Sequence, residues 1–504
     1  MMKNTYLLLI VLFLAWSCKK NSPSPSFLGV VSLEVTGSTE ATAHFEKGLL
    51  LLHSFEYQDA REAFKEAQQE DSEMAMAYWG EAMTYNHGLW SEQDYDKALA
   101  VMEKLEALDY ETNCSLLERD FIEAAKILYT QKTDKLERDN NYATYMKSLY
   151  QKYPDNHEVA AFYALSLLGS VSEGRDDEIY GKGAVIAQGI IAENPNHPGA
   201  LHYLIHSYDD PKHAALALDA ADAYAKVAPD ASHALHMPSH IYVAMGMWDE
   251  VVSSNIASYD ASLNRMKRKG LDGSARGYHA FHWLEYGRIQ QGNDREAAEM
   301  VWDMQGFMNE SPSPRARIHM VYLKGTYLVE TDDWESKIAE IPVKTTDLNI
   351  SVKSQYLFLE GMKAFKNEDA HALDSLITLA RNDIDRESFV IKAGRSKLCS
   401  NVSRADASQM DITGAEVRVA QLLSLAAWLA EDMEQVETHL LKSIELFEGM
   451  SFSYGPPRIQ KPVRELYADW LMEQGRLDEA RQQYGETLKI GPKRLRPTRA
   501  MESI

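Results

Sequence analysis

The sequence predicts an all-α protein, a solenoid in which antiparallel helix pairs stack on one another. Three observations predict this class. Apolar residues recur at the i, i+3, i+4, i+7 spacing that places them on one face of a helix. Glycine and proline are sparse, at 27 and 16 of 504 residues, so few positions interrupt a helix. Similar segments also recur at an offset of 34 residues, as Tyr208 and Tyr242 do, which is a typical length for one helix pair.

The composition is that of a folded, acidic protein. Hydrophobic residues make up 45% of the chain and charged residues 25%. Asp and Glu number 75 against 52 Lys and Arg, giving a net charge of −23. Such a surface repels phosphate backbones, so we expect no nucleic-acid partner. Three cysteines are too few for a disulfide framework.

The N-terminus is expected to direct export. Tyr6 to Trp16 is an uninterrupted apolar stretch, too short to span a bilayer but typical of a signal-peptide core. Small residues then precede Cys18, and a Ser- and Pro-rich stretch follows it, which resembles a bacterial lipoprotein signal. This resemblance implies a signal peptide at 1–17, lipidation of Cys18 and a lipid-anchor tether at 18–40. The alternative is ordinary secretory cleavage after Ser17.

Either route exports the protein. We therefore expect it in a bacterial cell envelope, as an outer-membrane lipoprotein that faces the periplasm or the surface. The membrane would be contacted through the lipid anchor only.

The first helix pair is predicted from two apolar faces, which carry Phe45, Gly48 and Leu52 in the first helix and Ala60, Phe64 and Ala67 in the second. The small residues Gly48 and Ala60 allow the two helices to approach closely, and Phe64 fills the space between them. A shift of 34 residues carries Gly48 to Ala82, where the next pair begins.

Weaker copies follow along the chain. Near the C-terminus, Ala480, Tyr484 and Pro492 occupy the Ala, Phe and Pro positions of a 34-residue pattern that also has Trp, Leu-Gly and Tyr positions. This pattern resembles that of tetratricopeptide repeats (TPR), which implies a right-handed superhelical solenoid. We expect it to occupy residues 41–500. The repeats are most regular at 41–90, 197–305 and 415–492, and degenerate at 111–195 and 311–410.

Longer segments, including HPGALHYLIHSYDD and HALHMPSHIYVAMG, resemble a family of exported bacterial TPR lipoproteins of undefined activity. The resemblance implies the fold and names no reaction. No HExxH, P-loop or GxGxxG motif is present, so no catalytic residue is predicted. The Pro-rich segment 452–462 is predicted to be a spacer between helices, and the alternative is that it leans into the groove.

The histidines form the one cluster whose side chains are suited to binding a metal or a ligand. Seven of the 16 lie between residues 197 and 240. His202 and His206 are four apart, which places them on one helix face, and His236 and His240 repeat the pair 34 residues later. Allowing for an insertion, His282 takes the position of His202 and His236, and Tyr286 that of His206 and His240. The TPR resemblance implies that these positions face the concave groove.

Three alternatives are open for this cluster. First, it binds a transition metal (zinc, copper, nickel or iron) through His202, His206, His236, His240 and His282, because neutral imidazole is a common metal ligand. Carboxylates for such a site are available at Glu285, Asp209 and Asp210. Second, the histidines with Tyr242 and Tyr286 hold a protein segment or a small ligand in the groove. Third, the rings pack against one another without a ligand.

The function favoured by the sequence is binding of a protein segment or a small ligand in the concave groove, because stacked helices offer a long concave surface. One alternative is a metal-binding protein, either without activity or as a metalloenzyme, with the histidines in the groove. Another is a structural scaffold of an envelope assembly.

Overall fold

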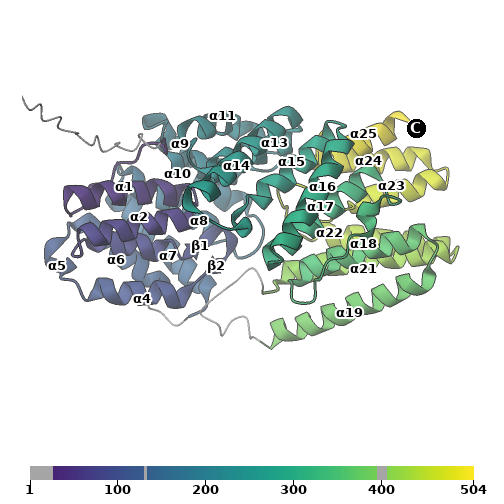
Figure 1. The fold of residues 1–504 in the computed structure, drawn as a ribbon, viewed down its shortest axis with the longest axis horizontal. Helices are drawn as coiled ribbons and strands as arrows, with labels where there is room; N and C mark the ends of the chain where they lie inside the picture. The colour runs from purple at the N-terminus through teal and green to yellow at the C-terminus, as the bar shows by residue number, and fades with distance from the viewer. Residues whose placement is uncertain (1–26, 130–132, 394–405) are drawn as a thin grey trace, which may run out of the picture.

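The structure is a computed structural model that describes residues 27–129, 133–393 and 406–504. It confirms the predicted all-α class: helices follow one another as antiparallel pairs in the TPR manner (Figure 1). Residues 1–17 and Cys18 lie outside the described residues, so export and lipidation stay predictions. Among the described helices, none combines the length and the apolar character that a membrane crossing requires.

The N-terminal half contains α1 (Thr39–His53), α2 (Tyr57–Glu70), α3 (Ala75–Met83), α4 (Tyr95–Glu106), α5 (Tyr110–Asn113), α6 (Leu116–Tyr129), α7 (Lys135–Lys152), α8 (His157–Gly169), α9 (Asp177–Glu193), α10 (Pro198–Tyr208), α11 (Leu218–Val227), α12 (Ser232–His236), α13 (Pro238–Met245) and α14 (Trp248–Lys269). Between them lie the 3-10 helices η1 (Gly88–Trp90), η2 (Ala214–Ala217) and η3 (Gly273–Ala275). Two short antiparallel strands, β1 (Asn86–His87) and β2 (Glu92–Gln93), flank η1, with Asn86 opposite Gln93.

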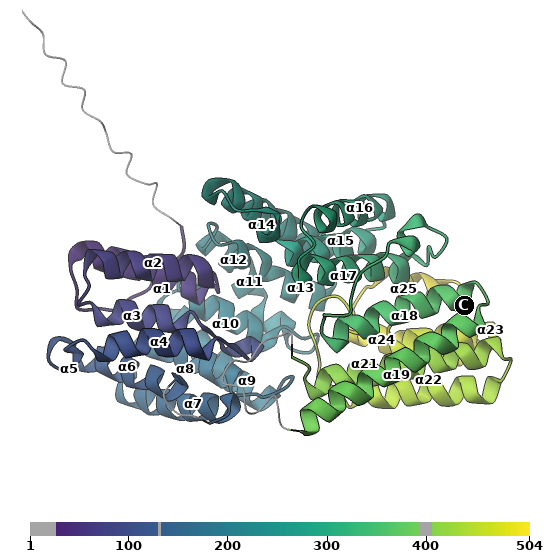
Figure 2. The same cartoon turned by 60° about the horizontal axis from the view of Figure 1, so that its bottom comes forward.

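The C-terminal half contains α15 (Tyr278–Gln290), α16 (Asp294–Glu310), α17 (Pro314–Thr331), η4 (Lys337–Glu340), α18 (Ile350–Lys366), α19 (Ala370–Lys392), α21 (Gln409–Leu429), α22 (Met433–Glu448), α23 (Val463–Glu473), α24 (Leu477–Ile490) and α25 (Leu495–Glu502). Figures 1 and 2 show that α1–α9 form one half of the molecule and α18–α24 the other, with α13–α15 between them. The described residues of the stretches predicted to be degenerate are thus mainly helical as well.

The described part of the predicted tether is not a tether. Residues 27–38 have no regular secondary structure and pack against the folded domain, with Leu28 and Val31 buried. Val30 N donates a hydrogen bond to Asn196 O at 2.9 Å, and the segment ends where α1 begins at Thr39. The boundary predicted at residue 40 is therefore wrong for residues 27–38, because their apolar side chains and backbone groups find partners on the folded domain.

The first helix pair packs as predicted. The Phe64 ring is fully buried between helices, and a Cβ at Gly48 would lie 2.7 Å from it. A Cβ at Gly80, on α3, would lie 2.3 Å from the same ring. Glycine at both positions therefore allows one phenylalanine to join three helices.

The hydrophobic core of the described residues has two large parts and two small clusters around α18 and α21, rather than one continuous part. One large part joins α1–α14, and the other joins α15–α24. Helix α15 contributes to both: Trp283 and Tyr286 pack into the first part, and Tyr278 and Phe281 into the second. The two parts meet across this helix, next to the histidines.

Contacts between distant repeats close the array. In an open solenoid each repeat contacts only its neighbours. Here Arg175 N donates to Ser451 Oγ at 2.7 Å, and Trp248 Nε1 donates to Lys493 O at 3.0 Å. The C-terminal segments thus fold back onto the middle of the chain and cover what would be an open groove.

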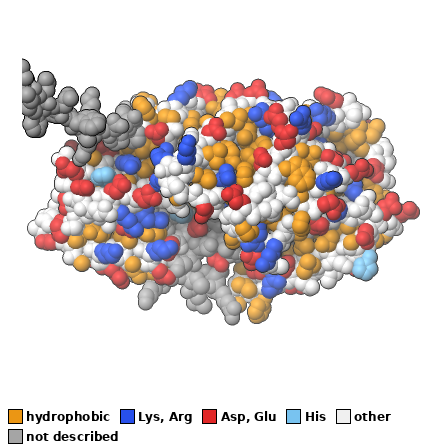
Figure 3. All heavy atoms as spheres, in the orientation of Figure 1, with side chains coloured by type: hydrophobic (Ala, Val, Ile, Leu, Met, Phe, Trp, Pro, Cys, Tyr) orange, Lys and Arg blue, Asp and Glu red, His pale blue; other side chains and the backbone are white. Residues whose placement is uncertain are grey.

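The surface carries charges of both signs. On the face in Figure 3, acidic and basic side chains are mixed, and hydrophobic side chains lie between them near the middle. Exposed large apolar residues include Ile256 on α14 and Trp302 on α16.

Candidate metal centre

The predicted histidines lie on consecutive helices in the middle of the chain. Helix α10 begins at Pro198, and His197 caps it by accepting a hydrogen bond from Ala200 N at 3.2 Å. Proline has no N–H group and fits only the first turn of a helix. In the next repeat, the helix that corresponds to α10 is accordingly interrupted: α12 ends at His236, and α13 begins at Pro238.

Four of the five predicted histidines come together. The ring centroids of His202 and His206 lie 4.9 Å apart, those of His206 and His240 5.3 Å, and those of His236 and His240 5.1 Å. The 34-residue offset thus predicts correctly that equivalent positions on consecutive repeats lie side by side. Whether the cluster binds a metal stays a prediction.

His282 does not join this cluster. Its Nε2 atom lies 2.9 Å from Thr326 Oγ1 on α17, and its ring lies 5.5 Å from that of Tyr322. His279, one turn earlier on α15, takes the expected place, with its ring 4.5 Å from that of His236. His279 and Trp283 are four residues apart and both contact His236, whereas His282 lies on the face toward α17.

His233 is the second member that the sequence prediction missed. Its ring lies 5.0 Å from that of His202 and 6.2 Å from that of His236. The i, i+4 rule overlooks it because it is three residues from His236, at the other end of the short α12. The HxxH spacing of His233 and His236 was the available signal.

Hydrogen bonds at Nδ1 fix the orientation of two of these rings. His202 Nδ1 lies 2.7 Å from His53 O, a carbonyl oxygen that only accepts, so Nδ1 is the donor. His236 Nδ1 lies 2.7 Å from Asn255 Oδ1, and the Asn255 amide group is itself oriented because its Nδ2 donates to Val251 O. In a neutral ring whose Nδ1 donates, Nε2 carries the lone pair.

Those lone pairs have no partner. Nε2 of His202, His206, His233 and His236 is buried and makes no hydrogen bond to any described residue. A buried nitrogen without a partner costs about 1–3 kcal/mol. In His202, His206 and His236 the second ring nitrogen, Nδ1, lies against an oxygen, which is the arrangement of metal-binding histidines.

Burial keeps most of the cluster neutral. It lowers the pKa of His236 to about 4 and holds the pKa values of His202, His233 and His240 well below the ordinary range. Neighbouring imidazoles add to the effect at each of the four, and at His236 the hydrogen bond with Asn255 opposes it. Neutral imidazole is the form that ligates a metal.

One carboxylate joins two of the helices. Asp209 Oδ2 lies 3.3 Å from His206 Nδ1 and 3.2 Å from His240 Nδ1. Its other oxygen accepts from Arg175 Nη1 at 3.1 Å. Asp209 therefore orients one ring on α10 and one on α13, and Arg175 holds the carboxylate in place.

The loop between α22 and α23 covers the cluster, and the prediction that segment 452–462 is a mere spacer is wrong. The Tyr454 ring lies 4.5 Å from that of His240 and 6.0 Å from that of His206. Gly455 has φ +89°, and a Cβ there would lie 2.2 Å from the Trp283 ring. Glycine is therefore required for the loop to approach this closely.

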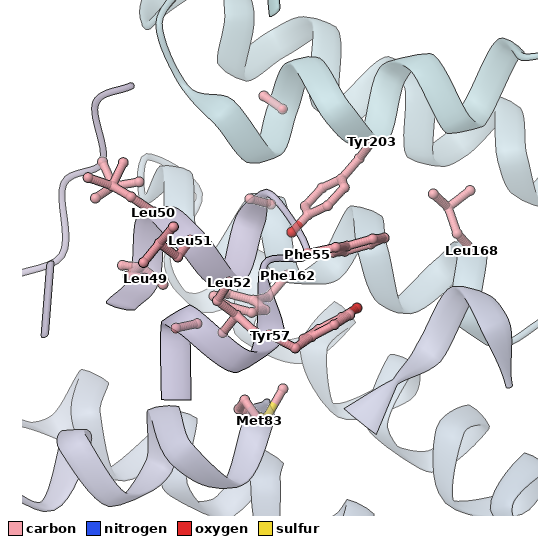
Figure 4. Close-up of a cluster of buried hydrophobic side chains, with 14 of the residues drawn as sticks. Leu49, Leu50, Leu51, Leu52, Phe55, Tyr57, Met83, Phe162, Leu168 and Tyr203 are labelled. Carbon is pink, nitrogen blue, oxygen red and sulfur yellow. The ribbon is translucent and has the colours of Figure 1, made fainter. Parts of the chain in front are cut away.

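Phe55 covers the opposite side. Its ring lies 4.3 Å from that of His202 and 5.7 Å from that of His233. Figure 4 shows Phe55 among Tyr203, Tyr57 and Phe162, which come from several helices. The cluster thus lies in an aromatic shell that excludes most water.

The expectation of an open groove is wrong for these residues. The side chains of His202, His206, His236 and His240 are at most 3% exposed. They lie inside the closed array because the loop and the returning C-terminal segments cover them.

The two predicted tyrosines face other spaces. The Tyr242 hydroxyl donates to Asp222 Oδ1 at 2.6 Å and lines a separate hollow between α11, α13 and α14. Tyr286 lines a cavity of about 290 Å³, which Asp209, Trp248, Met450 and other mainly apolar side chains complete. The predicted single groove with histidines and both tyrosines is therefore not formed, although Tyr286 and Asp209 share a wall.

The predicted carboxylates differ in position. Only Asp209 contacts the cluster. Asp210 pairs with Arg175 at 2.9 Å and with His213 at 2.8 Å. Glu285 is fully buried with no hydrogen-bond partner among the described residues, and burial together with nearby Glu330 raises its pKa well above the ordinary range.

Two further histidines, His53 and His197, have hydrogen-bond partners within the fold. Glu158 accepts hydrogen bonds from His53 Nε2 at 2.7 Å and from His197 Nε2 at 3.1 Å. His53 Nδ1 lies 2.8 Å from the Tyr203 hydroxyl. Burial alone would raise the pKa of Glu158, but the two imidazoles outweigh this effect and lower it. This group is a structural junction of α1, α8 and α10.

Acid is expected to weaken the fold through two histidines outside the cluster. Burial lowers the pKa of His282 to about 3 and that of His319 to about 4. An unfolded chain has a histidine pKa of about 6.5. Below that pH the unfolded state binds protons that the folded state does not, so the free energy of unfolding falls. Each histidine contributes up to about 1.4 kcal/mol per pH unit, down to its folded pKa.

The variant His319→Gln tests this expectation. The positive charge of Arg315 lowers the pKa of His319 further, whereas the hydrogen bond from His319 Nδ1 to the Arg315 carbonyl oxygen raises it. The rings of Tyr278 and Tyr322 pack against the His319 ring. The loss of stability between pH 6.5 and 4.5, measured by urea unfolding, should be smaller in the variant than in the unmodified protein. The exposed His371→Gln serves as control. An equal loss in all three proteins would contradict the prediction.

Comparisons with known proteins add little beyond the fold. No protein-family model matches the chain, and no curated protein matches it. Yeast Tom70 is a similar solved structure, at 13% identity and TM-score 0.32, covering 92% of this chain and 88% of that one. Cut9 of the Cut9–Hcn1 complex matches at 12% identity and TM-score 0.36, covering 94% and 78%. The TPR domain of P58(IPK) matches at 13% identity and TM-score 0.21, covering 92% and 97%.

These likenesses are too distant to bear on function. The class that the chain's own helices define is a TPR-like helical array. The histidine cluster at its centre is the feature that calls for a functional explanation.

Proposed function

We propose that this chain is a metal-binding protein whose buried histidines hold a transition-metal ion. The observation that supports it is the set of four buried Nε2 atoms, on α10 and α12, that have no partner in the described structure. A metal ion would satisfy these lone pairs, and the Nδ1 partners of His202 and His236 hold those two rings in the matching orientation.

The donor set limits the choice of metal. Imidazole suits zinc, copper, nickel and iron, whereas magnesium and calcium prefer oxygen ligands. No cysteine lies in the groups of potential ligands found among the described residues. When bound, such an ion acts as a Lewis acid or lowers the pKa of a bound water. The chain's own residues exclude bulk water, orient the rings and hold one carboxylate at the site.

Metal analysis of the protein purified without an affinity tag tests the proposal. We expect at least about one equivalent of a transition metal, and loss of nearly all of it in the double variant His202→Ala with His236→Ala. The control is His44→Ala with His157→Ala, which removes two histidines outside the cluster. Circular dichroism should show the same helix content in all three proteins.

Less than about 0.2 equivalents in the unmodified protein, both as purified and after incubation with metal, would refute the proposal. Equal metal content in the cluster variant and the control variant would refute it too, because binding would then lie elsewhere.

A small ligand beside the metal is a second candidate. The cavity of about 290 Å³ has a volume typical of small-molecule sites, and its wall includes Asp209, which also contacts His206 and His240. Binding of a protein segment stays a prediction from the fold class.

A further inference from the structure

The ligand atoms of the histidine cluster fall into two groups of three. We name His202, His206 and His233 the first triad, and His236, His240 and His279 the second triad. Within each triad, one nitrogen from every ring lies within 4.8 Å of the other two. The described residues contain no larger group of potential ligands at this spacing.

A single ion does not fit the whole cluster. Metal–nitrogen bonds are about 2.0–2.1 Å long, so the ligands of one ion lie within about 4.2 Å of one another. Among the described residues, no group of potential ligand atoms within 4.8 Å of one another contains more than three side chains, so the six imidazoles do not converge on one point. Small side-chain rotations close each triad around its own ion, but do not gather six rings around one.

Asp209 connects the two triads. The same carboxylate oxygen contacts His206 of the first triad and His240 of the second, at 3.3 and 3.2 Å. Its negative charge lies next to both triads, where it offsets part of the charge of two cations whose imidazole ligands are neutral. Helices α10 and α13 are thus fixed relative to each other at the point where the two ions would be closest.

Access to the second triad is available. His279 is exposed, whereas the other five histidines are buried or half-buried. The cavity that Asp209 lines is adjacent to the carboxylate that contacts both triads. Three protein ligands leave each ion an open coordination position, as in catalytic zinc sites.

We infer that the histidine cluster is a dinuclear centre, in which each triad binds one ion of zinc or copper. This inference rests on the proposed function and specifies its stoichiometry. Three neutral imidazoles without thiolate or carboxylate in the coordination shell favour these two metals over manganese or calcium. The pair of ions would share the space beside Asp209, where two-metal sites commonly activate a bridging water or a bound substrate.

Metal titration of single-triad variants tests the inference. The full chain, stripped with a chelator, is incubated with excess Zn²⁺ or, in parallel, Cu²⁺, dialysed and analysed. We expect two equivalents of at least one of the two metals. His233→Ala should retain one equivalent, His279→Ala one equivalent, and the double variant none. His282→Ala is the matched control on α15, and it should retain two.

The outcomes separate the inference from the proposed function. No uptake of either metal by the unmodified protein would overturn both. Uptake of one equivalent, lost equally in His233→Ala and His279→Ala, would overturn the dinuclear centre and leave a mononuclear metal protein. Because His279 is exposed, its variant should fold even if His233→Ala does not. In the copper-loaded protein, an electron paramagnetic resonance signal of isolated Cu²⁺ that accounts for all bound copper would also overturn the inference.

Discussion

Replacing Arg494 with Met is expected to destabilise the fold by about 3–5 kcal/mol, because it leaves the buried Glu330 carboxylate without its cationic partner. It also removes one cation from Glu465, which keeps Lys461 at 3.1 Å. Arg494 is 2% exposed and donates to Glu330 at 2.5 Å and to Glu465 at 2.9 Å. Burial alone would lower the pKa of Arg494, but these two carboxylates outweigh this effect and raise it. The guanidinium group joins α17 and α23 to the segment before α25, so its loss affects the closure of the array.

Urea unfolding followed by circular dichroism measures this effect. Arg295→Met is the control, since Arg295 is 91% exposed and pairs with Glu299, which is typical of ion pairs worth less than about 1 kcal/mol. Adding Glu330→Gln to Arg494→Met should recover part of the loss, because a neutral amide at that position is less costly to bury. Equal unfolding midpoints for Arg494→Met and the control would show that the buried pairs contribute nothing net.

The variant Asp209→Asn is expected to weaken metal binding about 10- to 100-fold, which is the usual effect of removing a carboxylate that orients metal-bound histidines. Asparagine keeps the size of the side chain but removes the charge that faces His206 and His240. The affinity is measured by competition with a chromophoric chelator, using Zn²⁺ and the stripped protein.

The neighbouring Asp210→Asn provides the matched control. Asp210 also pairs with Arg175, but its other partner is His213, outside the two triads. Its variant should bind Zn²⁺ as the unmodified protein does. If both variants lost affinity equally, the effect would come from Arg175 and the loop that carries it rather than from the orientation of the two rings.

Local sequence patterns predicted most of the fold. The apolar spacing located the helix pairs, and small residues such as Gly48 marked the closest helix contacts. The patterns did not show that residues 27–38 dock along the helices, or that the core divides at α15. Both depend on contacts between segments far apart in the chain, such as Val30 with Asn196, which helical periodicity does not encode.

The candidate site was predicted in part for the same reason. The 34-residue offset correctly placed His206 beside His240, because both lie at equivalent positions of regular helices. It failed where regularity ends. The break at Pro238 brings His233 into the cluster, and the insertion before α15 turns His279 rather than His282 toward it.

The covering loop was the other feature that the sequence did not reveal. A proline-rich segment between two helices has no periodic pattern to indicate what it contacts. Its position beside His240 results from the curvature of the whole array and from the close fit of Gly455 against Trp283. Single residues whose surroundings come from distant repeats are therefore identified only in the folded chain.

X-ray absorption spectroscopy at the metal edge tests the central claim most directly. For the metal-loaded, untagged protein, we predict a first shell of nitrogen ligands at about 2.0–2.1 Å with the outer-shell scattering of imidazole rings. At least three imidazoles per ion are expected. A first shell of oxygen or sulfur atoms without imidazole scattering would contradict the account, since the ion would then be bound outside the histidine cluster.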